Sequence, residues 1–513
     1  MEILARPTEF EDRAGPAFWI DEAIWGHRLH DEQSPWLTFL EFLTVLLAEH
    51  DAGRALREDR LNSLSYRPQL QLHLRNLVFN NPHVMTVRAL DRPDEAAWTL
   101  WLEKMADTAG GIDKPDFSYL RERFESFEDF AAVLGFLQGS AIEGNSNKRW
   151  SSKFVFPFGR HALYEDVNVK PGGSVSNDRR FFARTGELLY LMLARSADAD
   201  ALRALLVTRF LENPAPYDRM AQALQGEPQL AKAERGGAYL PCSRHAIFNR
   251  LAEDWLAVLS LPIPAHDAIP HLVTMTGLNL VLYQLDRARE LLKRDPIALV
   301  CEIVSSKKSV VRDLSADSYQ YNNLLPQQAI ERFVRRVTET DAWADALASD
   351  DPTLSALDIL QREFGWPDGE DDETAAEPDA FVDALVERAT VRHKQHVGKV
   401  HMTWARAIGL SSRRSSRRVR YAPTDRLLKT LVVACVGERL EFKDFLTLLY
   451  DRYGFVIGDA QARPFIDAGT ADQEDFSDNA HRLEERLASL GLLKRLSDSC
   501  AYVENPFQRA QAT

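Results

Sequence analysis

The chain contains few cysteines and no complete catalytic signature. Four cysteines occur in 513 residues and none lies in a CxxC pair, so a structural zinc knuckle is not expected. Single cysteines in apolar surroundings are typical of core residues in a protein from a reducing compartment. The sequence also lacks the GxxxxGK[ST], GxSxG and HExxH patterns, and no GxGxxG follows a strand. A P-loop ATPase is therefore not expected, and nothing in the sequence predicts a cofactor.

Long apolar runs and targeting signals are also missing. No apolar run reaches the roughly 18 residues needed to span a bilayer. The N-terminus has no basic region followed by an apolar run, which argues against a secretory signal. With 45% hydrophobic and 27% charged residues, the composition is typical of globular proteins. We therefore expect a soluble, cytoplasmic protein with no membrane contact.

Helical periodicity dominates the chain and predicts a mainly α, multidomain protein with a C-terminal winged-helix domain. No internal repeat with a period of about 20 to 50 residues is visible. We expect four parts: an N-terminal helical domain over 1–196 with a basic loop insert at 139–187, a helical middle domain over 197–366, an acidic linker over 367–380, and a basic helix and arm with the winged helix over 381–513.

Local signals place several helix ends. Ser34 precedes Pro35, which predicts an N-cap and first helical residue. Ser126 and Asp129 form a variant capping box. A helix is also expected to open at 177–180 and to run to about Arg195. Residues 305–325 look loop-like, and 381–410 read as one helix.

The last 90 residues show the element order of a winged helix. Apolar periodicity predicts a first helix that begins near Asp425 and a second that ends at Gly454, which is well placed just beyond a helix C-terminus. A third helix is expected from about Asn479 to Gly491. Two short strands follow at 492–496 and 500–503. Such a fold places its third helix in the DNA groove.

A basic run precedes this domain. Between Val391 and Thr430 the sequence has eleven Lys or Arg and one acid, a charge of +10 in a chain of net −14, so the remainder carries −24. A basic island in an acidic protein is typical of polyanion binding. The alternatives are a solvated linker or arginines that pair with acidic surfaces. The predicted phosphate contacts are Arg413, Arg414, Arg417, Arg418 and Arg420.

The loop at 139–187 is a second basic candidate. Long loops in compact domains are often functional. Its basic side chains are expected either to converge on a phosphate or to form salt bridges on the surface: Lys148, Arg149, Lys153, Arg160, Arg179, Arg180 and Arg184. An alternative function is a metal-dependent nuclease with carboxylates Glu143, Glu165 or Asp166 in this loop.

Three histidines are candidate metal ligands. His393 and His396 share a helix face, and His401 follows. Without a partnered acid or cysteine nearby, they are expected to extend the basic surface. The pairs at 21–22 and 31–32 are read as exposed helix-end charges.

Two other acidic features bear on function. Glu302 lies in an apolar run, but Val304 stands where a restriction-type nuclease needs a lysine. The segment 367–379 holds seven acids and no base. We expect that it shields the basic run in the resting state.

Three blocks carry a resemblance to a known group of proteins. They are Phe18-Trp19-Ile20-Asp21-Glu22-Ala23-Ile24-Trp25-Gly26-His27, Asn145-Ser146-Asn147-Lys148-Arg149-Trp150-Ser151-Ser152-Lys153, and Asn177-Asp178-Arg179-Arg180-Phe181-Phe182-Ala183-Arg184-Thr185-Gly186-Glu187. With them, the chain resembles uncharacterised prokaryotic antiviral defence-island proteins, such as accessory proteins of methylation-associated defence systems. The resemblance implies a non-catalytic partner of modification, helicase or nuclease subunits, and no catalytic residue.

The prediction from the sequence is a non-catalytic, DNA-associated structural or regulatory subunit of a bacterial complex. The third helix of the expected winged helix has His481, Arg482 and Arg486 beside Glu484 and Glu485. This mixed charge weakens the case for base reading and favours, as an alternative, a winged helix that docks other subunits without binding DNA.

Overall fold

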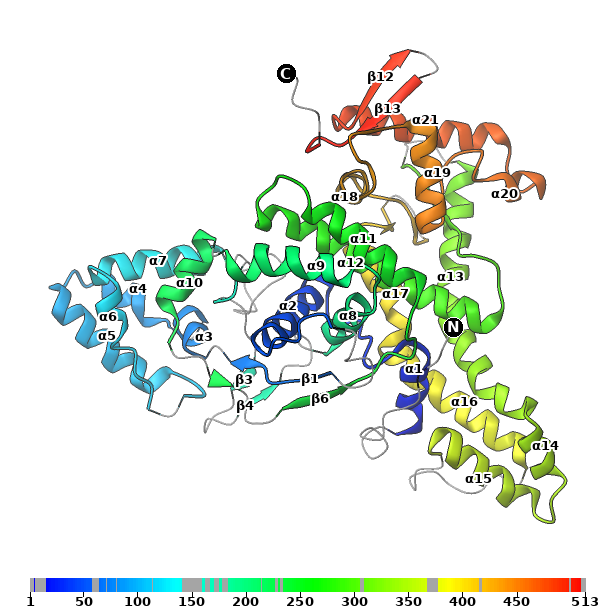
Figure 1. Ribbon diagram of the computed structural model, residues 1–513, viewed down its shortest axis with the longest axis horizontal. Helices are drawn as coiled ribbons and strands as arrows, with labels where there is room; N and C mark the ends of the chain where they lie inside the picture. The colour runs from blue at the N-terminus through cyan, green and yellow to red at the C-terminus, as the bar shows by residue number, and fades with distance from the viewer. Residues whose placement is uncertain are drawn as a thin grey trace.

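The chain folds into three lobes that meet around one long helix, α12 (Ala265–Leu292) (Figure 1). Helices dominate and the strands are short, which confirms the prediction of a mainly helical protein. The computed structural model describes residues 4, 15–57, 64–70, 72–79, 81–112, 114–140, 159–161, 167–169, 175–177, 183–213, 215–226, 229–230, 234–304, 309–366, 377–414, 418–497 and 500–508. Within these ranges, no helix is both long enough and apolar enough to cross a membrane.

Helix α12 is the centre of the molecule because most of its length is buried. Several of its buried polar side chains donate hydrogen bonds inside the core. Asn279 donates to Asp254 at 2.8 Å, and Gln284 donates to the Val397 carbonyl at 2.6 Å. The helices α1 (Pro16–Trp25), α2 (Pro35–Asp51), α11 (Ala246–Leu259) and α17 (Val400–Ala407) pack against α12. Helix α8 (Thr185–Ala194) packs on α2 and α11, and α9 (Ala199–Leu206) packs on α11. A π-helical turn, Val207–Glu212, continues α9.

One lobe has an apolar core of its own, at the left of Figure 1. Trp98, Trp101, Phe127 and Phe130 meet there, and the rings of Trp101 and Phe130 lie 4.7 Å apart between centroids. The lobe contains α3 (Leu72–Phe79), α4 (His83–Arg88), α5 (Asp94–Thr108), α6 (Leu120–Arg123), α7 (Phe127–Ser140) and α10 (Pro216–Leu224).

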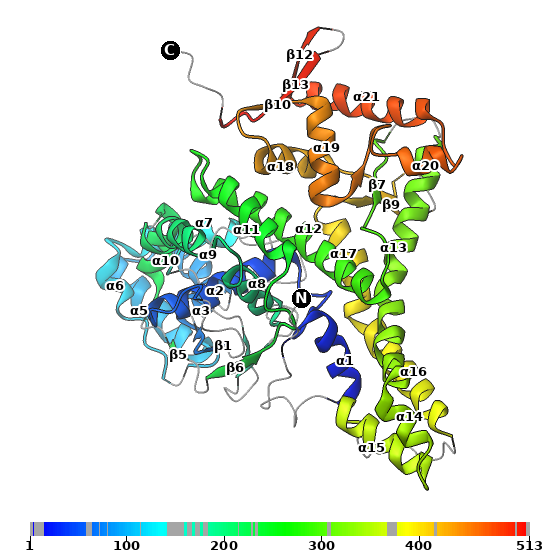
Figure 2. The same ribbon diagram turned by 45° about the vertical axis from the view of Figure 1, so that its right-hand side comes forward.

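A second lobe is built on α13 (Val310–Arg335), which runs from the C-terminal elements to the opposite end of the molecule (Figure 2). A 3-10 turn at Arg336–Glu339 follows α13. Beside its second half lie α14 (Asp341–Leu347), α15 (Pro352–Phe364) and α16 (Pro378–Gln395).

The C-terminal lobe combines helices with a three-stranded antiparallel sheet of order β10-β13-β12. Val503 of β13 is buried and lies between Leu440 of β10 and Leu493 of β12. The elements in chain order are α18 (Asp425–Cys435), β10 (Arg439–Glu441), α19 (Phe442–Tyr453), β11 (Phe455–Val456), α20 (Arg463–Asp467), α21 (Gln473–Ser489), β12 (Leu493–Ser497) and β13 (Cys500–Glu504).

The remaining strands form two-stranded pairs. The antiparallel pairs are β1 (Leu64–Tyr66) with β6 (Arg235–Ala238), β2 (Gln69–Leu70) with β5 (Gln229–Leu230), β3 (Val167–Val169) with β4 (Val175–Asn177), and β8 (Ser411–Ser412) with β9 (Arg420–Tyr421). One pair is parallel, β7 (Leu299–Val300) with β11, and it joins the centre of the molecule to the C-terminal lobe.

The main apolar core is continuous from Ile20 to Val503. It includes side chains from all three of the domains expected from the sequence, so the three parts share one hydrophobic core. Ten residues of the expected acidic linker, 367–376, lie outside the described residues.

Four helix predictions were wrong. The helix expected to start near Asn479 is α21, which begins at Gln473. Residues 310–325 form the first half of α13 and not a loop, and Pro326 lies inside this helix. The expected single helix over 381–410 breaks at His396, where a 3-10 turn over Val397–Lys399 separates α16 from α17. Helix α8 begins at Thr185, well after the expected start at 177–180.

Candidate nucleic-acid interface

The basic run forms the tip of a two-stranded hairpin. Strands β8 and β9 pair antiparallel, and the residues from Arg413 onward connect them. Arg413 and Arg414 are exposed, and the backbone N–H of Arg414 donates to Ser412 Oγ at 3.1 Å. Arg417 lies outside the described residues. The hairpin therefore carries its first two arginines at its tip.

The base of the hairpin is fixed to the core through Tyr421, which is fully buried. The Tyr421 carbonyl accepts from the Glu302 backbone N–H at 2.9 Å and from Ser315 Oγ at 2.8 Å. Its hydroxyl lies 2.8 Å from His401 Nε2 and accepts from Asn322 Nδ2 at 3.2 Å. Burial raises the pKa of Tyr421 well above its usual value, so the hydroxyl stays neutral. These contacts give the base of the hairpin a defined position relative to the core.

Arg420 is not part of the exposed tip. Its side chain is 0% exposed and forms an ion pair with Glu302, which also accepts from Arg312 Nε at 2.8 Å. The expectation of a phosphate contact at Arg420 is therefore corrected: the guanidinium neutralises a buried carboxylate. Glu302 is therefore buried between two arginines. A metal-dependent nuclease instead needs several carboxylates close together at an accessible site.

Arg418 has an intermediate position. Its guanidinium pairs with Asp317 on α13 and lies 3.4 Å from Gln320 Oε1, but about half of its side chain remains exposed. Exposed ion pairs are weak, so a phosphate is able to compete with Asp317 for this arginine.

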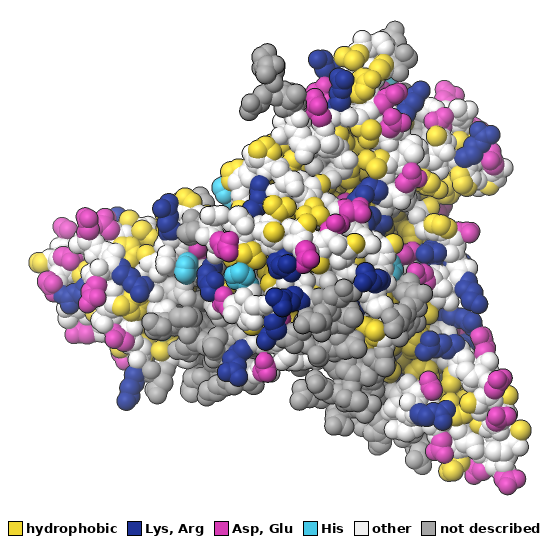
Figure 3. All heavy atoms as spheres, viewed as in Figure 1, with side chains coloured by type: hydrophobic (Ala, Val, Ile, Leu, Met, Phe, Trp, Pro, Cys, Tyr) yellow, Lys and Arg dark blue, Asp and Glu magenta, His cyan; other side chains and the backbone are white. Residues whose placement is uncertain are grey.

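Helix α21 of the C-terminal lobe has an excess of acids. Five acidic side chains and two arginines give it a charge of −3. Its arginines are paired, Arg486 with Asp425 at 2.5 Å and Arg482 with Asp478 at 3.4 Å. Figure 3 shows the same mixture on one whole face, where basic and acidic side chains are interspersed over all three lobes.

Most of the second basic candidate lies outside the described residues. This holds for Lys148, Arg149, Lys153, Arg179 and Arg180, and equally for the carboxylates Glu143, Glu165 and Asp166. The two described members are ion-paired, Arg160 with Asp51 at 2.7 Å and Arg184 with Glu187 at 2.7 Å.

The start of α8 uses a cap from another helix, which the sequence did not indicate. Arg184 precedes the helix with φ of 76° and offers no side-chain cap. Glu41 of α2 caps the helix instead. Its carboxyl group accepts hydrogen bonds from the backbone N–H of Arg184 at 3.1 Å and from that of Gly186 at 2.8 Å. A carboxylate at a helix N-terminus is favoured by the helix dipole. Glu41 is 143 residues away from Arg184, so no local signal existed.

Two of the three histidines are buried and do not extend a basic surface. His393 is 1% exposed, shares a 2.7 Å hydrogen bond with Asp21 Oδ1 and stacks on Trp25. His401 is 1% exposed and shares hydrogen bonds with Tyr421 and with Asn323 Oδ1. The expectation that these histidines extend the basic surface was therefore wrong for both.

Three acids expected on the surface are also buried: Asp21 at 6%, Glu22 at 4% and Asp31 at 8% exposure. Each shares a hydrogen bond with a histidine, Glu22 with His27 at 3.1 Å and Asp31 with His396 at 3.1 Å. The sequence around His393 and His396 has no acidic partner for them, and in the structure their acidic partners are Asp21 and Asp31 of the N-terminal region.

Comparison with known proteins gives one match. Residues 375–505 match the family described as methylation-associated defense system protein MAD7. No curated protein and no solved structure matches the chain.

The match supports the resemblance to antiviral defence-island proteins. It spans the chain from just before α16 to the end of β13, and therefore includes the hairpin tip, His393 and His396. The partners that anchor these residues, Glu302 and Asp21, lie outside it.

Proposed function

We propose that this chain is a non-catalytic, DNA-associated component of a methylation-associated antiviral defence system. The hairpin tip with Arg413 and Arg414 supplies its phosphate contacts. The observation that carries the proposal is the contrast within the hairpin: a base locked by Tyr421 and Arg420, and a tip with exposed arginines.

We also propose that residues 425–504 form a winged helix. The element order α18, β10, α19, β11, α20, α21, β12, β13 supports this. It contains a helix, a strand, two longer helices and a two-stranded wing, with β11 and the short α20 between the two longer helices. The sheet order β10-β13-β12 supports it as well, because the first strand pairs with the last.

Phosphate contact, and not base reading, is the mode that the charges favour. The helix that enters the groove in a winged helix corresponds to α21, whose charge of −3 repels DNA. The wing strand β12 instead exposes Lys494 and Arg495. Contacts from the tip and the wing add affinity without sequence preference and weaken with salt.

The proposal is tested by DNA binding across a salt series. The variant Arg413→Ala/Arg414→Ala removes two phosphate contacts. We expect weaker binding and a plot of log affinity against log salt that is shallower by about 2, because each phosphate contact contributes about 0.9.

The matched control is Arg88→Ala/Arg362→Ala, which removes two exposed arginines from other lobes. It should keep the wild-type slope. Equal slopes for both variants, or no DNA binding by the wild-type protein, would reject the phosphate-contacting tip.

A second candidate function is docking of another subunit without DNA. The acidic surface of α21 and the exposed Leu496 on β12 favour it. If it holds, Leu496→Asp disrupts a complex with a co-expressed component of the same system, while DNA binding is absent or unchanged.

A further inference from the structure

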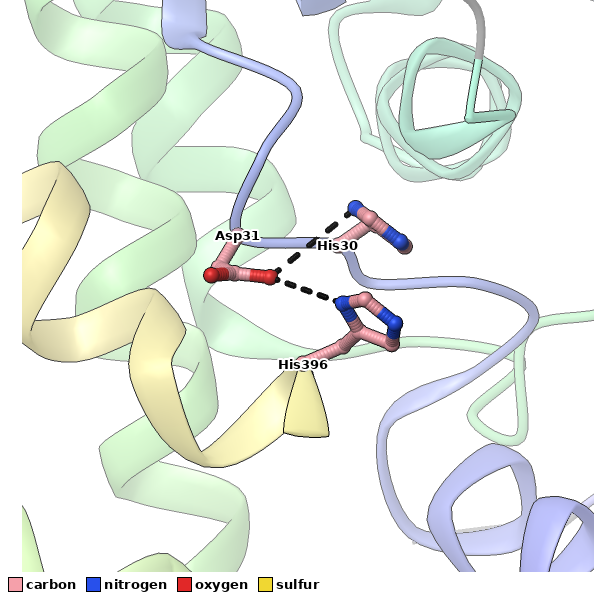
Figure 4. A group of neighbouring side chains, drawn as sticks. All are labelled: His30, Asp31 and His396. Carbon is pink, nitrogen blue, oxygen red and sulfur yellow. Dashed lines mark hydrogen bonds and ion pairs between the residues drawn. The ribbon is translucent and has the colours of Figure 1, made fainter. Parts of the chain in front are cut away.

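A cluster of two histidines and an aspartate lies where the N-terminal region meets α16 (Figure 4). His30 and Asp31 come from the loop between α1 and α2. His396 is the residue that ends α16, at the break that separates it from α17. Because the helix ends there, His396 can face the loop between α1 and α2.

The three side chains direct their ligand atoms to one place. Asp31 Oδ1 lies 3.1 Å from His396 Nδ1 and 3.9 Å from His30 Nδ1, and all three atoms are within 4.8 Å of one another. Figure 4 shows both Nδ1 atoms facing the carboxylate. Bonds of about 2.0–2.1 Å in a tetrahedral zinc site place neighbouring ligand atoms about 3.3 Å apart. The two distances to Asp31 therefore lie within about 0.6 Å of that spacing.

One hydrogen bond shows which nitrogen of His30 is unprotonated. His30 Nδ1 accepts from the Glu32 backbone N–H at 3.3 Å, and a metal ion would take over this lone pair from that hydrogen bond. Metal ions require neutral imidazole and ionised carboxylate ligands.

The cluster opens onto a cavity of about 360 Å³ lined by His30 and His396. Its lining carries three carboxylates, Asp21, Glu22 and Glu32, and two guanidiniums, Arg28 and Arg392. The carboxylate of Asp31 belongs to the adjoining cluster. Arg392 is held over the Phe18 ring, 3.7 Å from its centroid.

We propose that His30, Asp31 and His396 bind a divalent transition-metal ion. Zn²⁺ suits two imidazoles and one carboxylate, and a fourth position then faces the cavity and accepts water or a ligand oxygen. The ion joins the loop between α1 and α2 to the segment that matches the defence family, and in this way couples the two parts of the chain.

A second His–carboxylate group, His245 with Asp286 and Glu290, is a weaker candidate. Both carboxylates already pair with arginines, Asp286 with Arg289 and Glu290 with Arg287. His245 Nδ1 accepts from the Ile247 backbone N–H, so Nε2 carries the proton and faces the acids as a donor.

The test is Zn²⁺ binding to the metal-stripped full chain, measured by calorimetry, with Co²⁺ absorption as a report on ligand geometry. We expect one ion per chain and a higher melting temperature with Zn²⁺, since a ligand that binds the folded state stabilises it. His396→Ala and Asp31→Asn should each lower the affinity by at least about 100-fold, because each removes a direct ligand.

The matched control is His481→Ala, an exposed histidine that lies 3.7 Å from Glu484 and 3.4 Å from Glu485. It should bind Zn²⁺ like the wild-type chain. Melting without metal establishes that each variant is folded, and Asp31→Asn is the variant that preserves side-chain volume. No stoichiometric binding by the wild-type chain, or equal affinity in folded Asp31→Asn, would overturn the proposal.

Discussion

His401 shows how one buried side chain couples stability to pH. It lies under the hairpin base, where Nε2 is 2.8 Å from the Tyr421 hydroxyl and Nδ1 is 3.0 Å from Asn323 Oδ1. Burial lowers its pKa to about 3, whereas an unfolded histidine titrates near 6.5. The folded protein therefore keeps this imidazole neutral at pH values where the unfolded chain binds a proton.

The sign of the pH dependence follows. The stability that neutral His401 contributes is fully present above about pH 6.5 and is lost as pH falls toward about 3. One such group changes the unfolding free energy by up to about 1.4 kcal/mol per pH unit. We expect His401→Gln to show a shallower loss of stability between pH 6 and pH 4 than the wild-type chain, as measured by urea unfolding at a series of pH values.

His481→Gln is the control, because His481 is exposed and should leave the wild-type slope unchanged. An unchanged slope in His401→Gln would mean that His401 becomes protonated inside the folded protein.

The acidic partners of His393 and His396 could not be predicted from the sequence. The spacing of His393, His396 and His401 indicated no acidic partner. Their partners Asp21 and Asp31 lie 372 and 365 residues away. Such pairs depend on tertiary packing, and one sequence carries no local sign of them.

At the scale of elements, helix ends with local caps were predicted well. Ser34 accepts from the Leu37 N–H at 3.4 Å, and Ser126 accepts from the Asp129 N–H at 3.1 Å, which confirms both expected starts. Gly454 ends α19 with φ of 73°, as expected of a residue that follows a helix. These signals depend only on residues within one turn.

Helix ends set by distant residues were missed. The start of α8 depends on Glu41 of α2, and α16 ends where His396 meets Asp31. A proline normally breaks a helix, so Pro326 gave no reason to expect that the helix extends back over residues 310–325. In each case, tertiary contacts outweighed the local preference.

The close contact between α2 and α8 gives a test of the Glu41 cap. A Cβ atom on Gly186 would lie 2.6 Å from Glu41 Cβ and 2.7 Å from the Phe42 backbone nitrogen. Because one of these atoms belongs to the backbone, α2 and α8 must shift apart to admit the methyl group, so Gly186→Ala should lower the unfolding free energy by about 1–3 kcal/mol. Chemical denaturation of purified protein measures this change.

Gly135→Ala in α7 is the matched control, because its nearest neighbour, Met85 Sδ, would be 3.9 Å away. It should stabilise the protein by up to about 1 kcal/mol through helix propensity. A neutral Gly186→Ala would show that α2 and α8 separate more easily than their spacing indicates.

At the scale of the whole molecule, part of the charge of the basic segment is used inside the protein. Arg420 neutralises Glu302, Arg418 meets Asp317, and Arg392 covers Phe18. The linear count of +10 identified the right region but overstated the surface that is free to meet a phosphate. Only the structure separates the tip arginines from those that stabilise the fold.

The acidic segment 367–379 is expected to compete with DNA for the arginines of the hairpin tip. Neutralising Asp368, Glu370, Asp371, Asp372 and Glu373 to Asn or Gln should tighten DNA binding at low salt. The reason is that exposed arginines otherwise have these acids as competing partners. The gain should fade at high salt, where charges more than about 8 Å apart are screened. Fluorescence anisotropy with a short duplex at two salt concentrations measures it.

The control separates local shielding from a general change of net charge. Neutralising five exposed acids on the lobe of α4–α7, Asp91, Glu103, Asp107, Glu122 and Glu125, alters the net charge by the same amount. If both variants bind DNA more tightly to the same degree, the acids act through net charge and the shielding hypothesis is refuted. If only the segment variant gains, adding Arg413→Ala/Arg414→Ala should abolish the gain, because the tip is the site that the acids shield.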